Sequence, residues 1–230
     1  MTGLRALLAE AFDRHQTGGF EEAERLYHRI LAIEPAEPDT LHRAGLLVAQ
    51  LGRLEEADGL LRRSLALDPA ETEAAVNHGK ILRALRRPGA AARRFRHALA
   101  LVPAMLTALE GLGHAEREGG DAAAAATAYG RAARVGSGPA VLHQWGVVLD
   151  GIGLADEAVE ALHRSARLDP TVPSVALRLA GLLQRMGRGG EAAGWYRHAL
   201  VLQPGHAEAR RSLSVITAPG TAAGGPPLMT

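Results

Sequence analysis

The sequence predicts an all-α fold, a solenoid of six tandem helix–turn–helix repeats with one further helix capping its C-terminal end. Alanines recur along the 230 residues at steps of 34, 34, 34, 33 and 34. A small residue precedes each alanine by twelve positions, and a large apolar residue follows it by four. Self-similarity at a fixed period of this kind marks a repeat architecture. The six alanines are Ala23, Ala57, Ala91, Ala125, Ala158 and Ala192.

The helices follow from the periodicity inside each repeat. A first apolar stretch of about a dozen residues has the 3.6-residue period of a helix, and a second stretch follows after a turn. Glycine stands at that turn in five repeats, where it can adopt a positive φ at no steric cost. Proline closes the second helix of five repeats, because it cannot continue a helix. The turn glycines are Gly18, Gly52, Gly120, Gly153 and Gly187, and the prolines are Pro35, Pro69, Pro103, Pro170 and Pro204.

The repeat boundaries follow from this frame. One hairpin cannot bury its apolar stripe alone, so neighbouring repeats are expected to stack. Residues 207–216 are expected to form a capping helix, and the Gly/Pro/Ala-rich residues 217–230 a disordered tail. Repeat four is one residue short, and its end, Gly136-Ser137-Gly138-Pro139, is interpreted as an inter-repeat turn and not a phosphate loop. The repeats are expected at 4–37, 38–71, 72–105, 106–138, 139–172 and 173–206.

Composition and missing motifs exclude several functional classes. The chain has no cysteine, which removes disulfides, thiol catalysis and Cys-ligated metals. A formal net charge of +1 and 3% aromatic residues make nucleic acid an unfavoured partner. No apolar run approaches the ~18 residues of a membrane span, and the charged N-terminus lacks a signal-peptide pattern. Zinc-protease, dinucleotide and acyl-transfer motifs are also missing. A cytoplasmic, non-enzymatic protein without cofactor or membrane partner is therefore expected.

The repeated pattern resembles the tetratricopeptide repeat. Segments such as FEEAERLYHRILAIEP and LADEAVEALHRSARLDP carry the alanine, large apolar residue and proline of that family's second helix. The six repeats cover 203 of 230 residues (206 − 4 + 1), although the family's signature tryptophan is absent. The resemblance implies a right-handed superhelical solenoid whose first helices line a concave groove. It further implies a protein-interaction function, with a peptide or a helix of a partner held in that groove.

The resemblance also implies which residues line the groove. Asparagine and glutamine can pair with a peptide backbone, and arginine can bind a carboxylate bidentately, so Asn77, Lys80, Arg83, Gln144 and Arg178 are the strongest expected anchors. A carboxylate clamp of the chaperone-tail binders matches only at Asn77, and the asparagine ladder of O-glycosyltransferases is broken. The full predicted set is His42, Arg43, Asn77, Lys80, Arg83, Glu110, His114, Arg117, His143, Gln144 and Arg178.

Two further features leave alternatives open. Glu110, His114 and His143 could ligate zinc in principle, but a peptide-contacting or solvated face is the preferred interpretation. Repeat three carries seven Lys and Arg residues against Glu73, which predicts either a solvated basic surface or a docking patch for an acidic segment. The leading hypothesis is an adaptor. A self-associating scaffold, and an accessory module of a separately encoded glycosyl- or methyltransferase, are the alternatives.

Overall fold

The structure is a computed structural model that describes residues 2–218, and these residues form thirteen helices and no strand. They divide into two compact units, residues 1–128 and 129–230, which we describe separately. The predicted all-α fold of paired helices is confirmed, whereas the right-handed superhelix stays a prediction. No helix in the described part of the chain is both long and apolar enough to cross a membrane.

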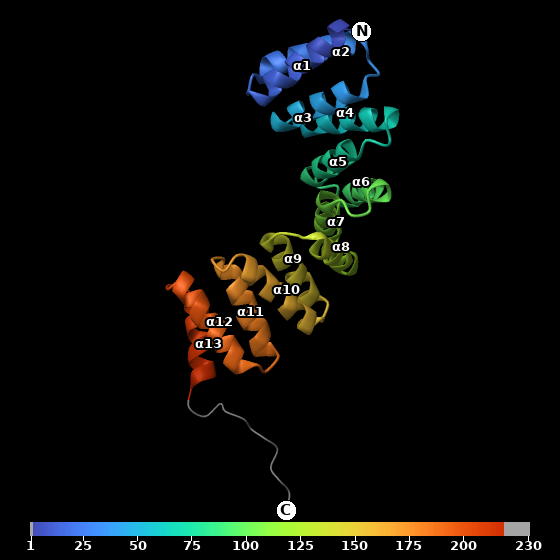
Figure 1. The fold of residues 1–230 in the computed structure, drawn as a ribbon. Helices are drawn as coiled ribbons and strands as arrows, with labels where there is room; N and C mark the ends of the chain where they lie inside the picture. Colours follow the sequence, from blue (N-terminus) through green and yellow to red (C-terminus); the bar gives the residue numbers. More distant parts are fainter. Residues whose placement is uncertain (1, 219–230) are drawn as a thin grey trace, which may run out of the picture. The chain divides into compact units, whose positions relative to one another are not determined.

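The N-terminal unit stacks successive helical hairpins (Figure 1, dark blue to green). Each helix packs on the next along the chain, and the first helix of one repeat also contacts the first helix of the following repeat. The helices are α1 (Thr2–Gln16), α2 (Phe20–Ile33), α3 (Pro38–Gln50), α4 (Leu54–Leu67), α5 (Thr72–Ala84), α6 (Pro88–Leu101) and α7 (Leu106–Glu118). The next helix, α8 (Ala122–Val135), contains the boundary between the two units.

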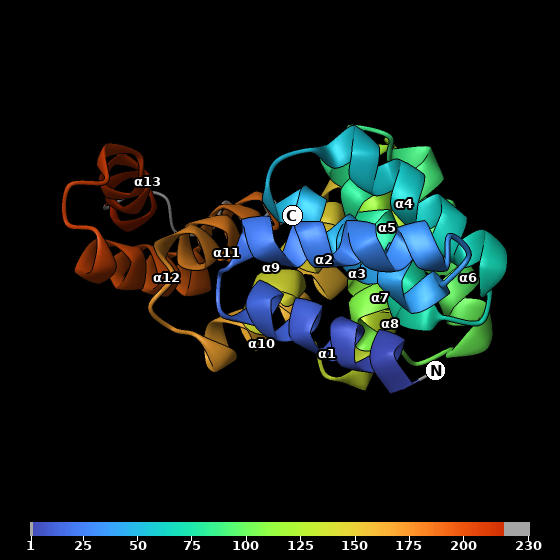
Figure 2. The ribbon, with the colours of Figure 1, turned by 90° about the horizontal axis from the view of Figure 1, so that it is seen from above.

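The C-terminal unit continues the same hairpin order and ends on a single helix. Its helices are α9 (Pro139–Gly151), α10 (Ala155–Leu168), α11 (Pro173–Arg185), α12 (Gly189–Leu202) and α13 (Ala207–Thr217). Figure 2 shows α13 beside α12, with which it packs. Thr217 therefore belongs to a helix and not to the expected tail. The rest of that tail, residues 219–230, lies outside the described residues.

Contacts between first helices create one continuous surface in each unit. In the N-terminal unit, α1 contacts α3, α3 contacts α5, and α5 contacts α7. In the C-terminal unit, α9 contacts α11 in the same way. We call these two surfaces the first-helix faces. Because the family resemblance places the groove on the first helices, these faces carry the predicted binding residues.

Small residues on the first helices make room for large residues on the second helices. Phe95 is fully buried, and its ring lies against both Gly79 and Gly111. A Cβ at Gly79 would stand 2.7 Å from the ring, and one at Gly111 would stand 2.4 Å from it. In the C-terminal unit, a Cβ at Gly146 would stand 2.7 Å from Cγ of Leu162. The spacing of small and large residues in the sequence therefore reflects direct contact.

The turns within five hairpins have the backbone that glycine favours. Their glycines adopt φ values from 76° to 88°. In repeat three the same turn holds Arg86, with φ of 58°, the one positive value outside glycine among the described residues. This left-handed conformation costs an L-residue roughly 1–2 kcal/mol of conformational free energy, because its Cβ approaches the following carbonyl oxygen.

Replacing Arg86 with glycine is expected to raise the free energy of unfolding by about 1 kcal/mol. Glycine removes the left-handed strain, although it also loosens the unfolded chain. Urea denaturation followed by circular dichroism measures the change. Arg93→Gly, inside helix α6, is the matched control and is expected to lower stability by about 1 kcal/mol. Equal destabilisation by both substitutions would contradict the assignment of strain to Arg86.

Candidate binding surface

The first-helix face of the N-terminal unit carries a chain of three predicted residues. Asn77 donates from Nδ2 to Nε2 of His42 at 3.1 Å, and Lys80 donates from Nζ to Oδ1 of Asn77 at 3.4 Å. His42 is buried, Asn77 is half-buried and Lys80 is exposed. His42 thus presents an unprotonated Nε2. Burial lowers its pKa, against the opposing influence of Glu71 and Asp39.

The predicted arginines of this unit are held by its own acidic groups. Arg83 binds Glu118 through Nε at 3.0 Å and Nη2 at 2.5 Å, which is a bidentate pair. The pKa of the Glu118 carboxyl falls below its usual value because of this hydrogen bond. Arg43 donates from Nε to Asp39 at 2.8 Å and lies 4.3 Å from the centre of the Phe12 ring. Both guanidinium groups are therefore engaged in the unbound chain.

Contacts across 35 residues recur along the first-helix faces. The pairs His15–Gln50 at 3.1 Å and His42–Asn77 at 3.1 Å both span this separation. So do the ion pairs Arg83–Glu118 in the N-terminal unit and Arg185–Asp150 in the C-terminal unit, the latter at 2.6 Å. A separation of 35 residues equals one repeat plus one residue. It therefore brings together neighbouring positions on successive first helices. Polar side chains of this face thus hold one repeat to the next as well as facing solvent.

Three of the seven cations of repeat three form ion pairs with acids of the neighbouring repeats. Arg87 bonds to Asp58 at 3.1 Å and to Glu55 at 3.4 Å, both in repeat two. Arg96 donates to Glu116 in repeat four, and Arg83 binds Glu118 there. Exposed ion pairs contribute about 0–1 kcal/mol each to the free energy of unfolding. These pairs therefore add little stability, and their main effect is to place opposite charges of adjacent repeats side by side. The docking patch for an acidic segment stays a prediction.

The remaining predicted residues of the N-terminal unit gather on α7. Glu110 and His114 lie four residues apart on one face of this helix, and both are half-buried. Arg117 is exposed one turn further on. Burial, together with Arg83 and Arg117, lowers the pKa of His114. His143 belongs to the other unit, so the predicted grouping of Glu110, His114 and His143 stays a prediction.

In the C-terminal unit, one of the predicted residues borders a hollow of about 420 Å³ between α11, α12 and α13. Arg178 lines it, is exposed, and forms no ion pair with any described residue. His143 lies close enough for the Arg178 charge to lower its pKa, although burial lowers it more. Gln144 is half-buried on α9. The hollow is lined by Ser174, Leu177, Arg178, Gly181, Arg185, Tyr196, His206, Glu208 and Ala209.

Side chains that the sequence did not single out shape this hollow. Tyr196 donates its hydroxyl to Oε1 of Gln184 at 2.8 Å, which fixes the ring on the floor. His206 accepts from the N–H of Ala209 through Nδ1 at 3.1 Å, so its Nε2 is left to donate to a ligand. At Gly181, an added Cβ would lie 3.8 Å from the Tyr196 hydroxyl. The sequence signal for His206 was its place just before the expected capping helix.

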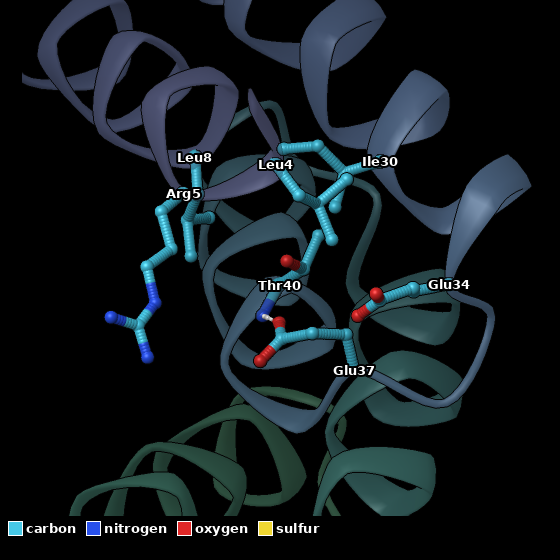
Figure 3. A pocket seen from close by; sticks show the side chains of 7 residues that line it. All are labelled: Leu4, Arg5, Leu8, Ile30, Glu34, Glu37 and Thr40. Carbon is cyan, nitrogen blue, oxygen red and sulfur yellow. Dashed lines mark hydrogen bonds between the residues drawn. The ribbon is translucent and has the colours of Figure 1, made fainter. Parts of the chain in front are cut away.

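A second hollow, of about 230 Å³, lies in the N-terminal unit between α1, α2 and the start of α3 (Figure 3). Leu4, Leu8 and Ile30 supply its apolar wall, and Arg5 stands on the side opposite Glu34 and Glu37 (Figure 3). The N–H of Thr40 donates to the Glu37 carboxylate, which caps α3. Its rim is therefore mixed in charge, with an excess of carboxylates.

One group of side chains among the described residues has the spacing of metal ligands. Glu24, His28 and Glu56 offer atoms within 4.8 Å of one another. Arg53 already bonds to both carboxylates, at 2.5 Å to Glu24 and 2.6 Å to Glu56. A guanidinium between two carboxylates supplies the positive charge that a metal would bring. This group is therefore an ion-pair network on the surface of α2 and α4.

Buried histidines predict loss of stability in mild acid. Burial lowers the pKa of His42, His78 and His114 in the folded chain. His78 donates from Nε2 to Asp58 at 2.6 Å, but its Nδ1 is buried without a partner, so the ring is neutral. The unfolded chain binds protons below about pH 6.5 while these rings resist protonation. Folding stability is therefore full above that pH and falls as the pH decreases through it.

The melting temperature is accordingly expected to be lower at about pH 5.5 than at about pH 7.5. Carboxylates such as Glu118, whose pKa is lowered, stay ionised across this range. His78→Asn should reduce the difference between the two melting temperatures, because it removes one of these rings. Differential scanning calorimetry provides the readout. An unchanged melting temperature across this range would contradict neutral burial of the rings.

Comparisons with known proteins agree with this architecture. The family profile described as Tetratricopeptide repeat matches residues 76–140. The solved structure of YrrB, a TPR protein with an unusual peptide-binding site, is 18% identical with a TM-score of 0.72, over 81% of this chain and 96% of that one. The structure of MamA is 24% identical with a TM-score of 0.66, over 70% and 94% of the two chains.

A third solved structure, pilF of Pseudomonas aeruginosa, is 20% identical with a TM-score of 0.70, over 90% of this chain and 95% of that one. No curated protein matches the chain. At these identities the structural likeness concerns the fold alone. The family match within repeats three to five, the recurring hairpins and the shared fold lead to one conclusion: residues 76–140 contain tetratricopeptide repeats, and the fold of the chain is that of tetratricopeptide repeat proteins.

Proposed function

We propose that the chain is a non-enzymatic adaptor that binds an acidic peptide segment of a partner on the first-helix face of its C-terminal unit. The observation that carries this proposal is Arg178. Its guanidinium lines a hollow of about 420 Å³ and makes no ion pair with the described residues. Arginine binds carboxylates in bidentate geometry, so a Glu or Asp side chain, or a terminal carboxylate, is the complementary group.

The other walls of the hollow suit a peptide. Leu177 offers apolar surface, while Ser174 and Nε2 of His206 offer polar groups beside it. Such a mixture of apolar surface and a few placed polar groups is typical of ligand sites. Glu208 also lines the hollow, in the first turn of α13 where the helix dipole stabilises its charge. A peptide backbone N–H could donate to Glu208 while an acidic side chain pairs with Arg178.

The N-terminal unit offers fewer available anchors for an acidic group. Arg83 and Arg43 are held by Glu118 and Asp39, so a ligand would have to displace these carboxylates. Asn77 and Lys80 stay as secondary contacts for a longer peptide. The peptide-binding site named for YrrB belongs to that protein, and the shared fold supports the proposal of a peptide ligand here. A self-associating scaffold and an accessory transferase module stay predictions.

Selection of displayed random peptides on the immobilised full chain tests the proposal. We expect the enriched peptides to carry Asp or Glu, and Arg178→Glu to abolish their binding by reversing the charge. The matched control is Arg197→Glu on α12, an exposed arginine that does not line the hollow, which should bind as the wild type does. Enriched peptides that bind Arg178→Glu and wild type equally well would refute the assignment.

A further inference from the structure

The second helices of the N-terminal unit share one pattern on their outward side. Positions i, i+3, i+4, i+7 and i+8 lie on the same side of a helix. In α2, α4 and α6 these positions hold cations first, then an alanine, and last an aliphatic residue. We call this surface the basic outer face, and all its residues except the half-buried His97 are exposed. They are Arg25, His28, Arg29, Ala32 and Ile33 on α2, Arg62, Arg63, Ala66 and Leu67 on α4, and Arg93, Arg96, His97, Ala100 and Leu101 on α6.

Acidic residues are missing from this part of the three helices. Residues 25–33, 59–67 and 93–101 contain no Asp or Glu. The acids of α2 and α4 lie at the beginning of each helix, and α6 has none. An acid, Glu34 or Asp68, directly follows α2 and α4, but none directly follows α6. The positive charge of the basic outer face is therefore least compensated at α6.

Most arginines of the basic outer face have no acidic partner. Arg96 binds Glu116, whereas the other five arginines form no ion pair with a described residue. Arg63 donates to the backbone carbonyl of Pro35 at 3.0 Å, which orients the guanidinium but does not neutralise its charge. This surface thus differs from the first-helix face of the same unit, where carboxylates hold the predicted arginines.

The cations of the three helices lie close to one another. The bond from Arg63 to Pro35 places the cations of α4 beside the end of α2. Burial lowers the pKa of His78 most, and the charges of Arg94 on α6 and Arg62 on α4 lower it further, against the opposing influence of its carboxylate partner. Cations from α4 and α6 therefore surround one buried side chain. The basic outer face is accordingly a single surface that spans three repeats.

Each row of cations ends on an exposed aliphatic side chain. Ile33 is 60% exposed, Leu67 47% and Leu101 44%, and each is the last residue of its helix. Single exposed apolar residues are normal, but here they recur at one position of successive repeats, next to cations. The basic outer face has no Phe, Tyr or Trp that could stack on a nucleic-acid base. Its chemistry therefore combines positive charge with aliphatic surface.

We propose that the basic outer face docks on an anionic lipid surface, with its arginines at the headgroups and its aliphatic residues at the boundary of the acyl chains. Anionic headgroups attract clustered arginines, and apolar side chains beside the cations enter the interface. A lipid surface carries extended negative charge, which suits cations spread over three helices. The expected absence of a membrane partner rested on the lack of a spanning segment, and docking on a surface does not need one.

Flotation of the full chain with lipid vesicles provides the test. The wild type is expected to float with vesicles of phosphatidylglycerol and phosphatidylcholine in equal parts, but not with phosphatidylcholine alone, and salt should release it. Arg62→Glu/Arg93→Glu should weaken binding to the anionic vesicles at least about tenfold. The matched control Arg197→Glu/Arg211→Glu changes the net charge equally at exposed sites of the C-terminal unit. It should float as the wild type does.

A second variant distinguishes a lipid surface from other polyanions. Leu67→Ser/Leu101→Ser should weaken vesicle binding several-fold but leave retention on a heparin column unchanged, because heparin contacts only the charge. The proposal is overturned if the wild type does not float with anionic vesicles, if Arg62→Glu/Arg93→Glu floats equally well, or if the serine variant binds vesicles without loss. Arg178→Glu separates this surface from the proposed peptide site, because that variant should lose acidic peptides and still float.

Discussion

Replacing Phe95 with alanine is expected to lower the free energy of unfolding by about 3–5 kcal/mol, the largest effect of any single substitution considered. The ring is fully buried and lies between Gly79 on α5 and Gly111 on α7, so it joins repeats three and four. Glycines at both contacts cannot grow to fill the space that the ring leaves. A cavity therefore adds to the lost transfer free energy.

Urea denaturation of the full chain measures this effect. Phe12→Ala provides the same chemical change at an exposed site, where the ring is 40% exposed and contacts Arg43. Its expected cost is about 1 kcal/mol or less. Similar losses from both substitutions would contradict the central packing role of Phe95.

Replacing Gly111 with alanine is expected to destabilise the chain by about 1–3 kcal/mol, even though alanine favours helices. The new Cβ would stand 2.4 Å from the Phe95 ring. The same ring also lies close to the backbone of Gly79, where a Cβ would stand 2.7 Å from it, so α5 limits how far the ring can move away. Overpacking must therefore shift α7 or distort the ring rotamer.

A second substitution distinguishes this steric cause from others. Phe95→Leu shortens the offending side chain, so the Gly111→Ala/Phe95→Leu double variant should be more stable than the sum of the two single effects predicts. Gly89→Ala is the matched control, because nothing lies within 4 Å of its Cβ position. It should be neutral or slightly stabilising in α6. Simple additivity of the two single effects would count against the clash.

The repeat frame and most of the core could be predicted from the sequence, because both depend on local chemistry. Glycine at Gly18 or Gly52 indicates a positive φ directly, since few other residues adopt it. Likewise, the distance in sequence between Gly79 and Phe95 already encodes their contact in a hairpin. Arg86 shows the limit of that reasoning, because the fold imposes a left-handed backbone there without the usual residue.

The arrangement of the expected groove residues could be predicted only in part. Asn77, Arg83 and Arg178 lie on first helices, as the family positions predicted. Those positions could not show that Arg83 is held by Glu118, whereas Arg178 forms no ion pair within residues 2–218. That difference depends on whether an acidic residue lies 35 positions further along the sequence, on the next first helix.

The surroundings of the charged residues in repeat three likewise could not be predicted from the sequence. A count along the sequence finds an isolated basic segment, which indicates an external acidic partner. In the structure, Arg87 reaches back to Asp58, and Arg83 reaches forward to Glu118. Opposite charges on adjacent repeats therefore pair with some of the cations of repeat three within the chain. Charge counted by repeat should be read together with the charge of the neighbouring repeats.

The central claim is that Arg178 binds a carboxylate of the partner peptide, and a charge swap tests it most directly. Calorimetric titration would compare an acidic peptide selected on the wild type with the same peptide carrying Lys in place of its key acid. We predict that Arg178→Glu loses the acidic peptide, that the wild type does not bind the Lys peptide, and that Arg178→Glu binds the Lys peptide. The account would be contradicted if Arg178→Glu bound the Lys peptide no more tightly than it binds the acidic peptide, or no more tightly than the wild type binds the Lys peptide.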